Sequence, residues 1–142
     1  MEKRRNEITL PPHVHDATYI EEHHIAITFE RDRAMSFSLG EKPLYHYVNT
    51  SNPVAGSHNT KTCIILTNRR FMKLEKGQQR CVELLSNITR AERGRAPGLL
   101  RYDRLNLILK DGTAKSCGIW GQDCCEFFAR IINLLITDHP TA

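Results

Sequence analysis

Five basic side chains between positions 42 and 73 have the chemistry to bind an anion. They are Lys42, Lys61, Arg69, Arg70 and Lys73. Arg and Lys bind phosphate through charge-assisted hydrogen bonds, which are shorter and stronger than hydrogen bonds between neutral groups. A second interpretation is that Arg69 and Arg70 are turn residues whose charges are solvated or paired with carboxylates. We treat this basic cluster as the first candidate binding site.

A second group of arginines follows later in the chain. It consists of Arg90, Arg93, Arg95, Arg101 and Arg104. A basic surface attracts nucleic-acid phosphates without reading sequence. However, Glu92 and Asp103 interrupt this group, and Tyr102 is the one aromatic residue within it, so base stacking has little support. The pattern favours a solvated edge strand, and we expect no specific nucleic-acid partner.

Two pairs of histidines raise the question of a metal site. His13 and His15 lie two positions apart, so on a strand they would point the same way and could share an ion. His23 and His24 are adjacent. No cysteine or carboxylate pair at a ligand spacing accompanies them, so we expect no metal and no cofactor.

Catalytic chemistry has the weakest support in the sequence. A nucleophile needs an adjacent base with an orienting partner. Cys63 and Cys117 lie in apolar, strand-like runs and have the pattern of structural residues. The chain contains no Gly-x-Ser-x-Gly, no phosphate-binding loop and no His-Glu-x-x-His. We therefore expect a protein that is not an enzyme.

The cysteines and the N-terminus predict a reducing compartment. The chain has five cysteines and no Cys-x-x-Cys, and adjacent Cys124 and Cys125 are poorly placed to bond to each other. We expect buried thiols and a cytoplasmic location, with peripheral membrane contact as an option. The first residues lack the apolar segment of a secretory signal, and no apolar run is long enough to span a bilayer.

The first part of the chain is predicted as an arm with one extra strand. Residues Met1 to Asp16 are charged and contain Pro11-Pro12, so we interpret them as a mobile tail. Ile25, Ile27 and Phe29 alternate with smaller residues, which predicts a half-buried strand. Thr18–Ile20 is a second candidate strand, with a helix over Tyr19–His24 as the alternative.

The middle of the chain reads as a succession of strands. The predicted segments are Leu44–Val48, a hairpin over Thr62–Gly77, Gln79–Leu85, Thr89–Arg95, Tyr102–Lys110 and Thr113–Trp120. Asn49–Thr60 is rich in Asn, Ser, Pro and Gly, so it predicts a loop. Asp111-Gly112 predicts a hairpin with a type I′ turn, because this dipeptide accepts positive φ angles.

The last element changes to a helical period. Its apolar residues are Cys124, Phe128, Ile131, Ile132 and Leu135. This stripe predicts an amphipathic helix that begins near Asp123, ends before Pro140 and covers an open end of the sheet. Glu126, Arg130 and Asn133 are predicted to face away from the core.

Several short motifs resemble one group of binding domains. These are Leu39-Gly-Glu41 before a strand, Ile65-Leu-Thr-Asn-Arg-Arg-Phe71, Gly77 and Leu84-Leu-Ser-Asn-Ile88. Together with the strand order they resemble the bacterial-type pleckstrin-homology (PH), GRAM and GLUE group. The resemblance implies an α+β, mainly antiparallel fold, a partly open barrel of about six or seven strands capped by a C-terminal helix. It divides the chain into an N-terminal arm (1–38), a PH-like domain (39–138) and a tail (139–142).

The resemblance implies a binding module, and a net charge of +4 is compatible with an acidic partner. The ligand-binding residues expected from it are Lys42, His58, Lys61, Arg69, Arg70 and Lys73. The expected ligand is a partner protein, a peptide or a phosphoinositide headgroup in an anionic membrane. The alternative is a structural subunit that forms a homo-oligomer, because exposed strand edges are templates for pairing.

Overall fold

The computed structural model describes residues 9–31, 35–49, 62–75, 78–95, 103–119 and 122–138. Within these ranges the chain forms two antiparallel sheets, three α-helices and one 3-10 turn. The first sheet has the order β1 (Val14–Asp16), β2 (Pro43–Asn49), β3 (Thr62–Thr67), β4 (Arg70–Glu75), β5 (Gln78–Leu84). The second has the order β6 (Ile88–Arg95), β7 (Asp103–Leu109), β8 (Ala114–Ile119). The helices are α1 (Ala17–Glu22), α2 (Ile25–Arg31) and α3 (Gln122–Asp138), and the 3-10 turn η2 is Leu85–Asn87.

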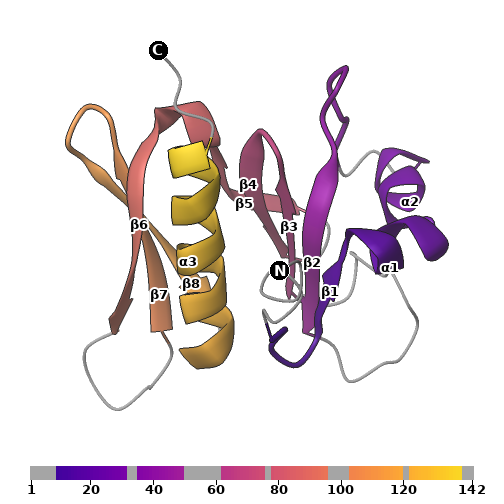
Figure 1. Ribbon diagram of the computed structural model, residues 1–142, viewed down its shortest axis with the longest axis horizontal. Coiled ribbons are helices and arrows are strands. Elements are labelled where there is room, and N and C mark those ends of the chain that lie inside the picture. The colour runs from indigo at the N-terminus through magenta and orange to yellow at the C-terminus, as the bar shows by residue number, and fades with distance from the viewer. Residues whose placement is uncertain are drawn as a thin grey trace, which may run out of the picture.

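These elements confirm an α+β fold of mostly antiparallel sheets with a C-terminal helix. In the described part of the chain no backbone ladder joins the two sheets, so they are not closed into a barrel. Figure 1 shows α3 between the second sheet and the first, and α1 and α2 on the opposite side of the first sheet. None of the described helices has the length and hydropathy needed to cross a membrane.

The strand β3 is buried on both faces of the first sheet, which explains its uninterrupted apolar run. Ile64 and Leu66 belong to the core shared with α3 and the second sheet. Cys63 and Ile65, which point the other way, belong to a second core with α1 and α2. A strand covered on both faces needs apolar residues at successive positions rather than at alternate ones.

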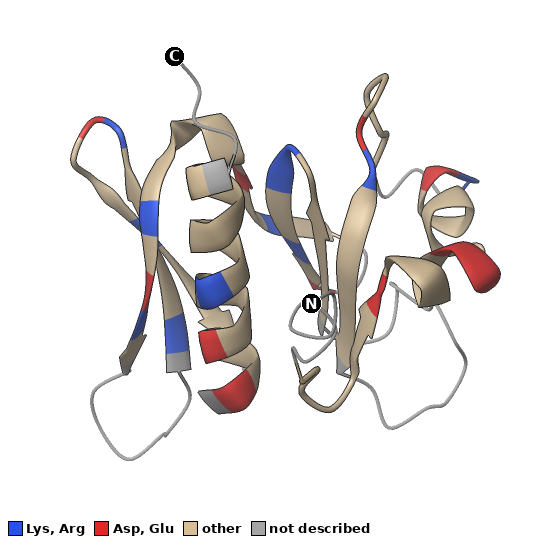
Figure 2. Ribbon diagram, in the orientation of Figure 1, with Lys and Arg blue, Asp and Glu red and all other residues tan. Residues whose placement is uncertain are grey.

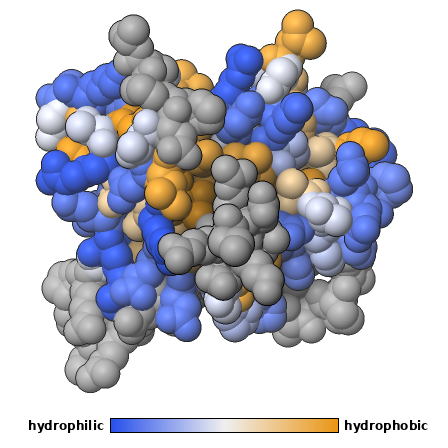
Figure 3. Space-filling model, viewed as in Figure 1, coloured by the Kyte–Doolittle hydropathy of each residue, from blue (hydrophilic) through white to orange (hydrophobic). Residues whose placement is uncertain are grey.

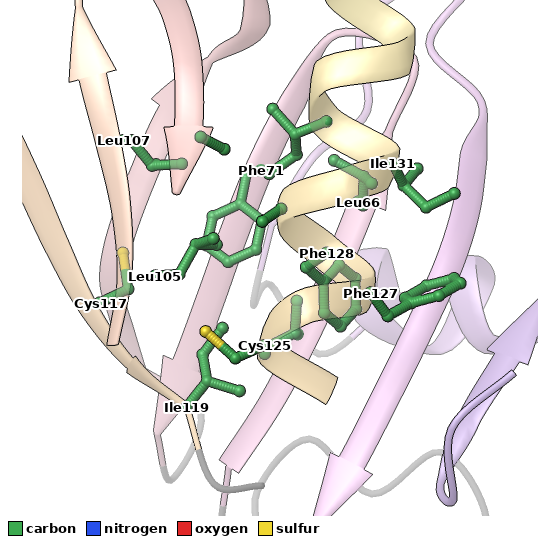
Figure 4. Close-up of a cluster of buried hydrophobic side chains, with 14 of the residues drawn as sticks. Leu66, Phe71, Leu105, Leu107, Cys117, Ile119, Cys125, Phe127, Phe128 and Ile131 are labelled. Atoms are coloured by element: carbon green, nitrogen blue, oxygen red, sulfur yellow. The ribbon is translucent and has the colours of Figure 1, made fainter. Parts of the chain in front are cut away.

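The amphipathic helix α3 was predicted correctly, and its apolar stripe fills the core between the sheets. Phe128 is fully buried and Ile131 is 4% exposed. The ring of Phe128 meets that of Phe71 edge to face, with centroids 6.0 Å apart. Figure 4 shows Phe71 and Leu105, from the two sheets, gathered with Phe128 around the helix. Burial of one such aromatic side chain contributes about 2–3 kcal/mol to stability.

The prediction of a strand at Ile25–Phe29 is wrong, because these residues form helix α2. Ile25 and Phe29 lie four residues apart, so on a helix they share one face, and both are fully buried. Ile27 lies on the other face and is 63% exposed. Over five residues, apolar positions at every second place are compatible with either period, so the pattern could not separate them.

The segment before α2 also differs from the prediction. Thr18–Ile20 is not a strand, since it lies in α1, as the helical alternative expected in part. Asp16 caps this helix by accepting a hydrogen bond from the backbone N–H of Tyr19 (3.1 Å). Val14–Asp16, predicted as part of a tail, forms β1 and pairs with β2 through Val14 opposite Tyr47.

The hairpin at Asp111-Gly112 is confirmed, but its turn type is not I′. Gly112 has φ +91°, whereas Asp111 does not have the positive φ that a type I′ turn needs at both central positions. The N–H of Gly112 donates to the carbonyl of Leu109 (2.9 Å), and the N–H of Leu109 donates to the carbonyl of Thr113 (2.8 Å). This is a three-residue loop with glycine in the left-handed position.

The polar side of α3 is only partly exposed. Arg130 faces solvent as predicted. Asn133 does not, because its side chain bonds to the backbone of Ala91 on β6. Glu126 forms an ion pair with Arg93 of the same strand (3.2 Å). The prediction that these side chains face away from the core is therefore wrong for Asn133, whereas Glu126 is exposed as predicted and still pairs with β6 through its carboxylate.

The expectation that the cysteines are all thiols is wrong for one pair. Cys81 of β5 and Cys117 of β8 form a disulfide, with Cα atoms 6.2 Å apart. Beside it, Lys115 of β8 donates to the carbonyl of Val82 (2.7 Å) and pairs with Glu83 (2.9 Å). The two sheets are thus connected at this corner by side chains.

Some predicted features lie outside the described residues. They are residues 1–8 of the predicted N-terminal tail, residues 50–60 of the predicted loop, Gly77, Tyr102, Trp120 and the tail at residues 139–142.

Candidate binding groove

A buried carboxylate holds the segment before β2 against the turn between β3 and β4. Glu41 is 9% exposed. Its Oε2 accepts hydrogen bonds from Thr67 Oγ1 (2.6 Å) and from Arg70 Nε (2.8 Å), and its Oε1 accepts from the backbone N–H of Ser38 (3.0 Å). A buried carboxylate needs such partners, because an unpaired charge is costly away from water.

Asn68 makes a second connection between the same two segments. Its Oδ1 accepts from the N–H of Lys42 (2.8 Å), and its Nδ2 donates to the carbonyl of Gly40 (3.1 Å). Gly40 has φ +81°, and a Cβ atom there would lie 3.1 Å from a guanidinium nitrogen of Arg69. The motifs Leu39-Gly-Glu41 and Thr67–Arg70, far apart in sequence, therefore form one structural unit.

The pKa of Glu41 is lowered from its usual value of 4.5. Burial raises this pKa, but hydrogen bonds from Thr67, Ser38 and Arg70, with the charge of Arg70, outweigh the effect of burial. Glu41 thus remains a carboxylate at neutral pH and positions the turn.

Two of the predicted ligand-binding residues use their charges within the protein. Arg70 pairs with Glu41 and also donates from Nη2 to the backbone carbonyl of Ser36. Lys73 forms an ion pair with Glu75 (3.2 Å), and its side chain is 11% exposed. Both side chains therefore contribute to holding the sheet and turn in place.

Arg69 and Lys42 are the exposed members of the predicted set. Both lie at the end of the first sheet formed by the β3–β4 turn and the start of β2. No Asp or Glu of the described residues forms an ion pair with Arg69. His58 and Lys61 lie outside the described residues.

Arg69 lines a groove of about 500 Å³ where the β3–β4 turn, η2, β6, the end of β7 and the last turns of α3 meet. The groove is lined by Asn68, Arg69, Leu84, Leu85, Ser86, Ile88, Thr89, Lys110, Leu135 and Ile136. Its charged lining residues are Arg69 and Lys110, and none of the lining residues in the described part of the chain is acidic. The groove is thus apolar on its walls and positive in charge.

Most residues of this groove were not predicted as site residues. Leu135 was assigned to the buried stripe of α3, and Leu84 to the apolar residues of a strand. Leu84 is in fact 53% exposed, and Leu134, next to Leu135, is 44% exposed. The sequence did carry one signal, the adjacent leucines Leu84-Leu85 at the end of a strand. Successive residues of a strand point to opposite faces, and here Leu85 is buried and Leu84 is exposed.

The helices and the strands differ in the sign of their charged residues. Figure 2 shows acidic residues on α1, on α2 and in the first turns of α3, while Lys and Arg lie mostly on the strands. Figure 3 shows hydrophobic residues gathered over α3, with hydrophilic residues around them. The basic residues are therefore concentrated on the strands, and the exposed hydrophobic residues of this face lie over α3.

Two of the four histidines near the N-terminus stack on the ring of Tyr19. Tyr19 lies between His15 and His23, with ring centroids 3.7 and 3.9 Å apart. Burial lowers the pKa of His15, and the nearby charges of His23 and His13 lower it further. The described residues contain no group of three or more His, Cys, Asp or Glu side chains placed to hold a metal ion.

The buried thiols have raised pKa values. Cys63 is fully buried, its Sγ lies 3.3 Å from Nε2 of His46, and burial raises its pKa. Burial raises the pKa of Cys124 to about 12, with a contribution from Cys125. Both side chains are therefore protonated at neutral pH, and the thiolate is the form that acts as a nucleophile.

Comparisons with protein families, with curated proteins and with solved structures found no match for this chain.

Proposed function

We propose that this protein is a PH-like, non-enzymatic recognition module that binds an anionic group of its partner beside Arg69. The observation that carries the proposal is the exposed Arg69 guanidinium, which pairs with no described carboxylate. The backbone N–H of Arg69 donates to Thr67 Oγ1, which itself donates to Glu41, so the network holds the backbone from which this side chain projects. A guanidinium binds carboxylate and phosphate groups through two parallel hydrogen bonds.

The arrangement of strands supports the PH-like part of the proposal. The strands β2 to β8 follow one another as two antiparallel meanders, and α3 comes after them. Phe128 and Ile131 of α3 are buried between the sheets. β1 is an additional edge strand of the first sheet, and α1 and α2 are additional helices on one face of that sheet.

The distribution of charge supports an anionic ligand. Arg70 and Lys73 are paired with Glu41 and Glu75, so their charges are compensated. Arg69 and Lys110 line one groove without an acidic neighbour in its described lining. The positive charge of Arg69, which no described carboxylate pairs with, favours binding of an acidic partner on a protein of net charge +4.

The test is a chemical-shift survey of the labelled protein against two anionic probes, inositol hexakisphosphate and a glutamate-rich peptide. We expect the amide signals of Asn68, Ser86 and Thr89 to move with at least one probe. Arg69→Gln should weaken that binding by about tenfold, because a hydrogen bond to a charged group contributes about 1.5–3 kcal/mol.

Arg80→Gln is the matched control. Arg80 is an exposed arginine of β5, 55% exposed and close to Glu75, and it does not line the groove. If Arg69→Gln and Arg80→Gln lose the same affinity for the probe, the proposal is contradicted. Chemical-shift changes confined to residues away from the groove would contradict it too.

A further inference from the structure

We propose that the groove binds a segment of a partner protein in which carboxylates stand next to large aliphatic or aromatic side chains. This inference rests on the proposed function and names the kind of partner that the same groove accepts. The occupant is a protein segment rather than a lipid headgroup.

The apolar walls of the groove argue for an occupant with apolar side chains. Leu85 and Ile88 of this lining are already buried in the core, whereas Leu84 is 53% exposed and Leu135 and Ile136 of α3 are half-buried. An inositol phosphate is polar over its whole surface, so it would not bury the apolar surface that Leu84, Leu135 and Ile136 leave in the groove. A leucine, isoleucine or phenylalanine side chain would remove apolar surface from water on both partners.

An exposed leucine in the groove points to the same kind of partner. Four large apolar side chains of the described residues are markedly exposed: Ile27, Leu39, Leu84 and Leu134. Leu84 is the one among them that lines the groove, beside the half-buried Leu135 and Ile136. Apolar surface that stays in contact with water inside a groove can be buried by a partner.

Arg69 provides the charge complementarity. It comes from the β3–β4 turn, and Lys110, in the turn after β7, adds a second positive charge to the lining. Lys110 is anchored by its backbone N–H, which donates to the carbonyl of Asn87 (3.0 Å). A segment with carboxylates beside its apolar residues can pair with these cations while its apolar side chains enter the groove.

The volume of about 500 Å³ limits the length of the segment that the groove holds. A site of this size accommodates a small-molecule ligand or a few side chains. The contact is therefore a short linear motif, in which two or three side chains provide most of the binding energy.

The test uses a panel of short synthetic peptides in which Glu alternates with Leu, Ile or Phe. Binding of each labelled peptide to the protein is measured by fluorescence anisotropy. Matched peptides carry Gln in place of Glu, or Ala in place of the large apolar residues. We expect both replacements to weaken binding at least fivefold. Leu84→Asn in the full-length protein should weaken binding by about five- to tenfold, and Ile27→Asn, at an equally exposed site on α2, should leave it unchanged.

Inositol hexakisphosphate separates the two levels of the proposal. If it binds with sensitivity to Arg69→Gln but not to Leu84→Asn, and the peptides do not bind, the protein-segment inference is overturned while the recognition module stands. Peptide binding that ignores Leu84→Asn also overturns the inference. If neither probe binds in a way that depends on Arg69, both the inference and the proposed function are wrong.

Discussion

The carboxamide of Asn133 on α3 forms two hydrogen bonds with the backbone of Ala91 on β6. Its Oδ1 accepts from the N–H of Ala91 (2.8 Å), and its Nδ2 donates to the carbonyl of the same residue (2.9 Å). These are the bonds that a neighbouring strand would make, so one side chain satisfies the outer edge of β6 at this position. The pair also determines how α3 is rotated against the second sheet.

Replacing Asn133 with alanine should lower the free energy of unfolding by about 1–3 kcal/mol, because a part-buried N–H and carbonyl lose their partner. Alanine is a better helix former than asparagine, so helix propensity opposes this loss. The measurement is urea denaturation followed by circular dichroism. Arg130→Ala, on the exposed face of the same helix, should change stability by less than about 0.5 kcal/mol. Similar losses in both variants would mean that the Asn133 contact does not stabilise the fold.

The adjacent arginines of the β3–β4 turn should respond differently to the same substitution. Arg70→Gln removes the cation that pairs with buried Glu41, so we expect a loss of about 2–4 kcal/mol in stability. Arg69→Gln should cost less than about 0.5 kcal/mol, because its guanidinium is exposed. Denaturation of the two variants side by side tests this. A large loss for Arg69→Gln would show that this residue is structural and would weaken its assignment to ligand binding.

Stability should decrease as the pH falls below the usual glutamate pKa of 4.5. The folded-state pKa of Glu41 lies below this value, so the unfolded chain takes up the proton first. The contribution of Glu41 is therefore complete above pH 4.5 and is lost as the pH falls through the folded-state pKa.

Urea denaturation at a series of acidic pH values measures this slope. Glu41→Gln should flatten it, and Arg70→Gln should flatten it in part. Some slope should remain, because the pKa of Glu83 is also lowered by hydrogen bonds from Asn87 and Lys115 that outweigh the effect of burial. A slope that is identical in the parent and in Glu41→Gln would rule out the proposed role of the Glu41 carboxylate.

The disulfide predicts how many thiols the purified protein contains. Cys81 and Cys117 are bonded, so three of the five cysteines, Cys63, Cys124 and Cys125, should react with a thiol reagent after denaturation without reductant. Reduction should raise the count to five. Reduction should also lower stability by about 2–4 kcal/mol, because 36 positions separate the bonded residues.

A count of five thiols before reduction would contradict the disulfide. A count of three would argue against the cytoplasmic location inferred from the cysteine pattern, since structural disulfides persist in oxidising compartments.

The second core should make α2 part of the cooperative fold. Phe29 is fully buried, and its ring lies edge to face with that of His46 on β2 (5.8 Å). Phe29→Ala should cost about 3–5 kcal/mol, because it leaves a cavity against the first sheet. Ile27→Ala, on the exposed face of the same helix, should cost less than about 0.5 kcal/mol. The measurement is urea denaturation followed by NMR, with amide signals of α2 and of the sheets read separately. If Phe29→Ala removes the α2 signals while the urea midpoint of the sheet signals stays the same, α1 and α2 form a separate arm.

The strands from Leu44 onward and the helix α3 could be predicted because their patterns are long or end in distinctive turns. The stripe of α3 repeats over several helical turns, which a strand cannot match. The hairpin at Asp111-Gly112 could be located because this dipeptide is common in turns. The turn type could not be predicted, because it depends on the φ angle of Asp111, and aspartate fits turns with either sign of φ. At Ile25–Phe29 five residues were too few to separate the two periods.

The basic cluster shows the same limit for the site. The sequence alone identified Arg69, Arg70 and Lys73 as cations but could not say which of them pair with carboxylates. Glu41 is 29 positions from Arg70, and only the folded chain brings the two together. Local composition therefore could not distinguish a structural arginine from an exposed one.

Side-chain periodicity and turn residues, which act over a few positions, determined the mainly antiparallel strands and the closing helix. The tertiary structure decided which face of the first sheet α2 covers, that Asn133 binds Ala91, and that Leu84, Arg69 and Leu135 line one groove. These relationships join residues that are distant in the chain, and they depend on how the layers pack, which no local pattern specifies.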